Sequence, residues 1–212
     1  MARQNRVTPY GEIVAVSERG TVMGNRGLLH DEAGRLRRPW QVKRWILCCL
    51  EFRGRRRVVM APGRYTELFF LDEATGLAAG HRPCFECRRA SFTSFSDAWA
   101  RGIPGMGRPT AARIDERLHA ERVGPARSKR TFRACVTDLP DGAFVACDGD
   151  EVGAYLLWEG RLLAWSPGGY SAGRSLPGET EVTVLTPKST LDVIRAGYVP
   201  DIHPSAQGAW AS

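Results

Sequence analysis

The 212-residue chain lacks the features of a membrane-spanning or secreted protein. No apolar run approaches the roughly 20 residues that a helix needs to cross a bilayer. The basic N-terminus, MARQNRVTPYG, has no apolar stretch of the kind found in a signal peptide. We therefore expect a cytoplasmic protein with no membrane partner. In a reducing compartment the six cysteines are expected to bind metal or to be buried, and not to form three disulfides.

Lysine is scarce, since 27 of the 30 basic residues are arginine. A genome rich in G and C would explain that bias without any functional meaning. It would not explain where the charge lies. Residues 1–133 carry 26 basic and 13 acidic side chains, whereas residues 134–212 carry 4 and 10. A strongly basic half is typical of proteins that contact phosphate backbones.

The hydrophobic patterns predict an α+β protein in two units. A basic, zinc-knuckle-containing unit is expected over residues 1–123, and a small acidic β-rich domain over residues 131–212, separated by the break GPARSKR. In the first unit we expect strands near 11–16, 44–52 and 69–71, and helices at 73–79, around Phe92–Trp99 and at 110–123. In the second we expect several short strands, a loop at 166–178, a strand at 181–186 and a helix at 189–196.

The chain has a single Cys-x-x-Cys motif, formed by Cys84 and Cys87 in the segment HRPCFECRR. Asp72 is a predicted N-cap and Gly80 a predicted C-terminal stop for the preceding helix, so the motif lies at the start of the next one. Two thiols at this spacing hold one tetrahedral metal ion or act as a redox pair. A thiol at a helix N-terminus beside arginines also has a lowered pKa, which leaves a reactive cysteine as an alternative.

The strand, the Asp-led helix, the Ala-Gly turn and the Arg-Pro-Cys-x-x-Cys-Arg sequence resemble the second half of the metal-binding domain of the Ada DNA-repair proteins. The resemblance covers about residues 69–89. In that family four cysteines hold zinc, and one of them takes a methyl group from DNA phosphotriesters. The resemblance implies zinc as the cofactor, Cys84 and Cys87 as the second ligand pair, and a role in DNA repair. The family's first pair, a Cys-x-x-x-Cys, is absent, and the adjacent Cys48 and Cys49 stand upstream instead.

Two further ligands are needed for a tetrahedral zinc site. Cys48 and Cys49 are the leading candidates because they lie on a predicted strand, and the histidines that could also serve are His30, His81 and His119. Because side chains alternate along a strand, only one of the two adjacent thiols is expected to face the Cys84–Cys87 pair. Cys49 is also a candidate for a DNA-reactive thiol. Burial of both thiols as small core residues is the alternative.

A cluster of arginines at a predicted hairpin tip, between the strand at 44–52 and residues 57–60, points to nucleic-acid contact. Together with the arginines of the cysteine motif, the predicted contacts to nucleic acid, most simply DNA, are Arg53, Arg55, Arg56, Arg57, Arg82, Arg88 and Arg89. The favoured function is a zinc-binding protein that binds or processes nucleic acid in DNA repair. The alternatives are an interaction module and a small-molecule enzyme with a thiol or zinc site for an anionic substrate, using His30, Tyr65 or Glu67.

Overall fold

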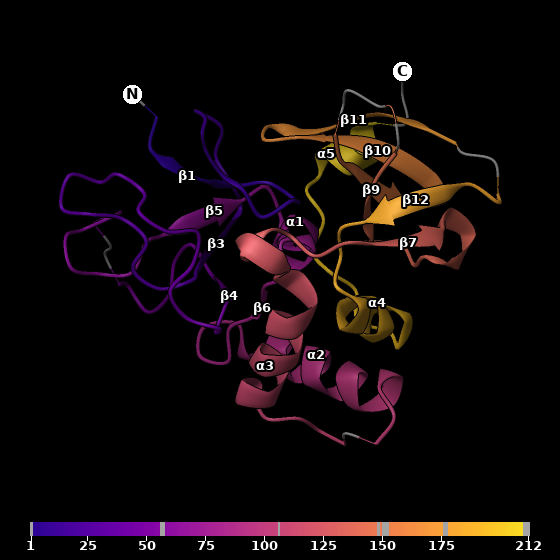
Figure 1. Cartoon of the computed structure of the whole chain (residues 1–212), viewed down its shortest axis with the longest axis horizontal. Helices are drawn as coiled ribbons and strands as arrows, with labels where there is room; N and C mark the ends of the chain where they lie inside the picture. The colour runs from indigo at the N-terminus through magenta and orange to yellow at the C-terminus, as the bar shows by residue number, and fades with distance from the viewer. Residues whose placement is uncertain are drawn as a thin grey trace.

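A computed structural model shows a mixed α+β fold with two six-stranded sheets and five α-helices (Figure 1). The structure describes residues 2–55, 58–105, 107–147, 149, 153–175 and 178–209. The predicted α+β class is confirmed. Within these ranges, no helix combines the length and apolar character needed to cross a bilayer.

The first sheet has the strand order β2-β1-β5-β3-β4-β6. Its strands are β1 (Gln4–Val7), β2 (Ile13–Ala15), β3 (Val22–Asn25), β4 (Ile46–Cys48), β5 (Leu68–Phe70) and β6 (Arg82–Pro83). Strands β1 and β5 pair in parallel, as do β4 and β6, and the other pairs are antiparallel. The register of β4 and β6 places Leu47 opposite Pro83, so the residues that follow these two strands meet at one edge.

The second sheet is antiparallel, with the order β11-β10-β9-β8-β12-β7. Its strands are β7 (Phe132–Cys135), β8 (Phe144–Ala146), β9 (Tyr155–Trp158), β10 (Arg161–Ser166), β11 (Gly169–Arg174) and β12 (Glu181–Val184). The two-residue turn between β9 and β10 consists of Glu159 and Gly160, both with positive φ. That is the backbone of a primed hairpin turn, which matches the twist of the strands it joins.

The helices are α1 (Glu73–Ala78), α2 (Arg89–Gly102), α3 (Ala111–Arg122), α4 (Lys188–Arg195) and α5 (Ser205–Gly208), with 3-10 turns at Pro125–Arg127 and Val136–Asp138. Asp72 caps α1 by accepting a hydrogen bond from the backbone N–H of Thr75 at 2.8 Å. The helix ends before Gly80, whose φ is +89°. The local signals at Asp72 and Gly80 therefore set the two ends of α1, as predicted.

Three sequence-based expectations were wrong in detail. The strand predicted over 44–52 is paired only from Ile46 to Cys48, and residues 58–60 form no strand, since a turn lies at 59–60. The predicted loop 166–178 contains β11, paired with β10. Its glycines suggested a loop, but Gly173 packs closely on β10, where an added Cβ would lie 2.7 Å from Leu163 Cδ2. Glycine here permits close strand packing and does not mark a turn.

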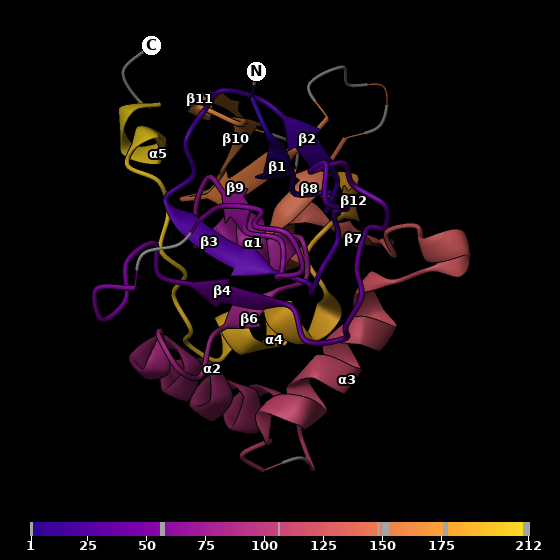
Figure 2. The same ribbon diagram turned by 90° about the vertical axis from the view of Figure 1, so that its left-hand side faces the viewer.

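The two halves of the chain share their hydrophobic cores. Helix α1 is buried between the two sheets (Figures 1 and 2), with Leu77 in the cluster of the first sheet and Ala74 and Ala78 in a cluster with the second. Helix α4 comes from the second half of the sequence but packs against α2 and α3. Val193 of α4 and the following Tyr198 belong to the core cluster of the first half.

Candidate metal centre

The first sheet brings two distant cysteine segments together. Cys48 is the last residue of β4, and Cys84 directly follows β6, the parallel neighbour of β4. The backbone N–H of Cys84 donates to the carbonyl of Leu47 at 2.8 Å, which extends the pairing to the cysteine itself. A turn then leads from Cys84 to Arg88, whose N–H donates to the Cys84 carbonyl at 3.1 Å, and α2 begins at the next residue.

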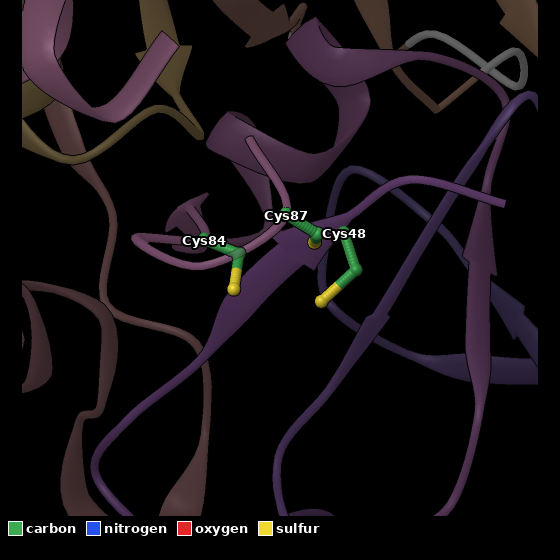
Figure 3. Close-up of side chains that lie close together, drawn as sticks. All are labelled: Cys48, Cys84 and Cys87. Atoms are coloured by element: carbon green, nitrogen blue, oxygen red, sulfur yellow. The ribbon is translucent and has the colours of Figure 1, made fainter. Parts of the chain in front are cut away.

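The sulfur atoms of Cys48, Cys84 and Cys87 all lie within 4.8 Å of one another (Figure 3). Cys48 and Cys84 are buried, each with 7% of its surface exposed. A tetrahedral zinc ion with Zn–S bonds of about 2.3 Å places its sulfur ligands about 3.8 Å apart. The three thiols are therefore within about 1 Å of the spacing that such an ion needs, and the sulfur donor set suits zinc. Among the described residues, no histidine or carboxylate atom joins this group.

Cys49 is adjacent to the cluster but is not one of its three members. Its Sγ donates to the carbonyl oxygen of Cys87 at 3.1 Å, and burial raises the pKa of this thiol. A raised pKa disfavours the thiolate, which is the nucleophilic form of cysteine.

The predicted histidine ligands lie elsewhere. His81 is fully buried and accepts a hydrogen bond from Arg26 Nε at 3.3 Å. His30 Nδ1 lies 2.6 Å from the Thr66 hydroxyl, and His119 packs edge-on against Trp40 at a centroid distance of 4.8 Å. Each of the three histidines therefore has a packing or hydrogen-bonding role.

Hydrogen bonds within the cluster divide the protons unequally among the three thiols. The single S–H of Cys48 is shared with the nearby sulfurs of Cys84 and Cys87, and this raises the pKa of Cys48. The bond from Cys48, together with the backbone N–H groups of Cys87 and Glu86, lowers the pKa of Cys84 to about 5. The same Cys48 thiol and the N–H of Cys49 lower the pKa of Cys87 to about 7. At neutral pH the Cys84 thiol is therefore ionised and the Cys87 thiol is about half ionised, and the thiolate is the form of cysteine that binds a metal cation.

The cluster lines a pocket of about 650 Å³. Polar side chains from other segments line the same pocket, namely Asn25, Gln41, Arg44, Arg55 and Tyr65. Phe85, which lies between the two cysteines of the motif, also contributes to its wall, and half of its surface is exposed. A metal ion held by the three sulfurs would therefore lie next to a space large enough for a small ligand.

Two of the predicted nucleic-acid contacts lie in the interior instead. Arg82 has 2% of its surface exposed, and its Nε and Nη2 donate to the carboxylate of Asp115 at 3.0 and 2.7 Å. Arg88 forms a bidentate pair with Glu73 at 2.8 and 3.0 Å and also contacts Asp201 at 2.8 Å. Both guanidinium groups are held in ion pairs with carboxylates, and Arg82 also lines the cysteine pocket.

The remaining predicted contacts differ in their surroundings. Arg53, Arg55 and Arg89 are exposed. Arg55 pairs with Glu86 at 2.7 Å, and Arg89 stacks on Phe85 at 5.0 Å from the ring centroid. Arg56 and Arg57 lie outside the described residues.

Arg44 is the residue of the pocket that the sequence reasoning missed. It is exposed, lines the pocket and lies two residues before the start of β4. Strand alternation provided a signal for it, because residues 44, 46 and 48 share one face of an extended segment. Ile46 and Cys48 do line the same pocket.

Comparison of the chain with models of protein families, with curated proteins and with solved structures found no match. The fold and the site by themselves define an α+β protein whose three clustered cysteines are able to hold a metal ion beside a pocket.

Proposed function

We propose that the chain is a zinc-binding protein that binds nucleic acid and acts in DNA repair. The observation that carries the proposal is the cluster of Cys48, Cys84 and Cys87 in the wall of a pocket that also presents arginine and aromatic side chains. Bound by the three thiolates, zinc supplies a cross-link between β4 and the turn before α2, which couples metal binding to folding. Arg44, Arg55 and Phe85 would then be held in fixed positions around the centre.

The side chains around the pocket support nucleic acid as the ligand. Arg44 supplies positive charge on its wall, Arg55 lines the wall as well but is paired with Glu86, and Arg89 lies over the half-exposed ring of Phe85. Tyr65 is a second exposed aromatic residue of the pocket, with 38% of its surface exposed. Arginine charge contacts the phosphate backbone, and exposed rings stack on unpaired bases. The combination favours single-stranded or locally unpaired nucleic acid.

The decisive experiment measures binding of a fluorescent DNA oligonucleotide, single-stranded and duplex, to zinc-loaded protein between 50 and 200 mM salt. Over this range the affinity of a protein that makes roughly 6–10 phosphate contacts falls by orders of magnitude. Arg44→Gln and Arg55→Gln should each lower the slope of log K against log salt by about 0.7–0.9. Phe85→Ala should weaken single-strand binding about 5- to 150-fold, the equivalent of about 1–3 kcal/mol for one stacked base.

Arg195→Gln is the matched control, because it removes an exposed arginine from α4, which does not line the pocket. It should leave affinity and salt slope unchanged. The proposal fails if the protein binds neither DNA nor RNA at low salt, or if the pocket variants and the control behave alike. A role in repair further requires tighter binding to DNA with methyl phosphotriesters than to unmodified DNA, a preference that the resemblance of residues 69–89 to the Ada domain supports.

A second candidate function is a small-molecule enzyme that acts on an anionic substrate at the same centre. The size of the pocket favours it, and so does the fact that three ligands cluster among the described residues, because catalytic zinc sites keep one position for water or substrate. Of the polar groups predicted for such an enzyme, Tyr65 lines the pocket. His30 and Glu67 are buried, and Glu67 accepts from the N–H of Met60 at 2.7 Å. A small anion bound through one or two arginines would show a shallow salt dependence, which separates this candidate from the first.

A further inference from the structure

A second cavity, of about 50 Å³, lies apart from the cysteine pocket and shares no lining residue with it. Arg26, one residue beyond β3, and Arg122, the last residue of α3, line this cavity together with Lys129 and Arg127 from the segment after α3. The indole of Trp45 lies between two of these groups, 4.1 Å from the Arg26 guanidinium and 4.0 Å from that of Arg122. Four cationic side chains therefore converge on one small space.

The cavity contains no compensating negative charge. None of its lining residues, all of which lie in the described part of the chain, is aspartate or glutamate. Arg26 and Arg122 have only 1% and 2% of their surfaces exposed. Burial lowers the pKa of each guanidinium to about 9, so both carry charge at neutral pH. The charge of Asp115 raises the pKa of Arg122, but this carboxylate is itself held in the bidentate pair with Arg82.

Arg26 and Arg122 donate to neutral backbone carbonyls, and one nitrogen of each guanidinium has no hydrogen-bond partner among the described residues. Arg26 Nη1 donates to the carbonyl of Gly11 at 2.8 Å, and Arg122 Nη1 donates to that of Gly80 at 2.7 Å. Among the described residues, neither Arg26 Nη2 nor Arg122 Nε has a hydrogen-bond partner, although both atoms are buried. An unpaired buried donor on a charged group is costly, and buried charges in proteins are normally paired. Lys129 adds further donors, since its amino group donates to the carbonyl of Ala78 and forms no other bond among the described residues. Burial lowers the pKa of this amine to about 7, and a bound anion would favour its charged form.

We infer that this cavity is a binding site for one compact oxyanion, a phosphate group. A water molecule needs about 10–15 Å³ of such space, so 50 Å³ holds about four oxygen-sized atoms, the number in phosphate. Guanidinium and ammonium groups are the side chains that bind phosphate oxygens most strongly. Arg127 and Ser128 line the cavity and are exposed, so it reaches the surface on their side. Either free phosphate or the terminal phosphate of a monoester fits this chemistry.

The test is isothermal titration of the full-length protein with inorganic phosphate, and separately with a nucleoside 5′-monophosphate, at constant ionic strength in sodium chloride. Lys129→Met retains most of the side-chain length and removes one cation, and we expect it to weaken phosphate binding at least tenfold. Arg130→Met changes the neighbouring exposed residue, which does not line the cavity, and should leave the affinity unchanged. Binding of inorganic phosphate alone would identify free phosphate as the ligand, and binding of both would identify phosphomonoesters as well.

Thermal unfolding gives a second measurement that does not depend on a variant. Phosphate at about 100 times its Kd should raise the Tm of the wild-type protein by about 5–10 °C above the value in chloride of equal ionic strength. Equal Tm values in the two salts, no binding of either ligand, or unchanged affinity in Lys129→Met would each overturn the inference. Arg44→Gln, which alters the cysteine pocket, should not change phosphate binding, so this result is separable from the outcome for the proposed function.

Discussion

Cys48 distinguishes the observed cluster from a simple Cys-x-x-Cys turn, because it adds a third sulfur from a separate strand. The adjacent Cys49 lies just beyond β4, is less buried and is not part of the cluster, and its Sγ bonds to a backbone carbonyl. The contrast between these two neighbours is a sharp test of the metal site at the scale of single residues.

Cys48→Ser and Cys84→Ser should each abolish stoichiometric zinc binding, whereas Cys49→Ser should retain it. At free zinc about 1,000 times Kd, the ion stabilises the native state by about 4 kcal/mol. For a chain of this length, its loss should lower Tm by about 8–16 °C. Metal content by mass spectrometry and thermal unfolding check both effects. Cys135→Ser is the control, because Cys135 lies on β7 of the second sheet, away from the cluster, and its Sγ is hydrogen-bonded to the Thr137 hydroxyl. Loss of zinc in Cys49→Ser to the same degree as in Cys48→Ser would contradict the three-sulfur site.

The unequal pKa values of the three thiols predict how many protons zinc displaces. At pH 8, Cys84 and Cys87, with pKa values of about 5 and 7, are already thiolates, so only the proton on Cys48 should be released. At pH 6, Cys87 is protonated as well, and about two protons should be released. Affinity should accordingly fall as pH decreases. Calorimetry in buffers of different ionisation enthalpy measures this number, with Ca²⁺ as a control cation that avoids thiols. Release of three protons at both pH values would contradict this assignment.

At the scale of elements, the turn that carries Cys84 and Cys87 is fixed to the rest of the fold through Arg88. This arginine directly follows Cys87 and bonds to Glu73, the first residue of α1. Glu73 in turn accepts from the Tyr198 hydroxyl at 2.7 Å and from the N–H of Asp201 at 3.0 Å. One buried carboxylate thus joins the cysteine turn, helix α1 and the segment after α4.

Arg88→Met should lower the free energy of unfolding by about 3–5 kcal/mol, because it leaves the Glu73 carboxylate buried without its cation. Arg89→Met is a matched control at the next position, where the side chain is exposed, and should change stability by less than about 0.5 kcal/mol. Urea unfolding of zinc-free protein measures both changes without the contribution of the metal. Similar stabilities for the two variants would show that the ion pair has no structural role.

Local signals predicted some elements well, and non-local contacts account for what they missed. The N-cap Asp72, the stop at Gly80 and the apolar spacing of Phe92, Phe95 and Trp99 depend on neighbours a few residues away, and α1 and α2 formed where these signals placed them. The pairing of β4 with β6 joins segments far apart in sequence, so the motif alone could not select Cys48 over Cys49. Strand alternation narrowed the choice to one of the two.

The arginines illustrate the same limit. Arg82 was predicted to contact nucleic acid because it is one of the arginines that surround the Cys84–Cys87 motif. The position of its guanidinium depends on Asp115, 33 positions away in α3, which pairs with it in the interior. Arg26 and Arg122 likewise meet only through the tertiary fold, so no sequence pattern indicated the cationic cavity.

On the scale of the whole molecule, the division of the chain into two sheets does not divide its core. The strands of the first sheet lie within residues 4–83 and those of the second within residues 132–184. Part of the segment after 184 returns to the first half, where Val193 and Tyr198 pack with Phe95 and Trp99. The separate units predicted at 1–123 and 131–212 stay a prediction, and the shared core provides a direct test of them.

Residues 1–123, expressed alone, should fail to unfold cooperatively even with zinc present. The fragment would expose the faces of α1 and α2 that Tyr198, Val193 and the second sheet cover, and burial of each large side chain contributes about 1.5–3 kcal/mol. Typical domains are stable by only about 5–15 kcal/mol, so the loss of several such contacts removes the margin. Circular dichroism melting of the fragment, compared with the full chain at equal concentration, measures the effect. A cooperative transition near that of the full chain would show that the first unit folds independently and that its contacts with α4 are dispensable.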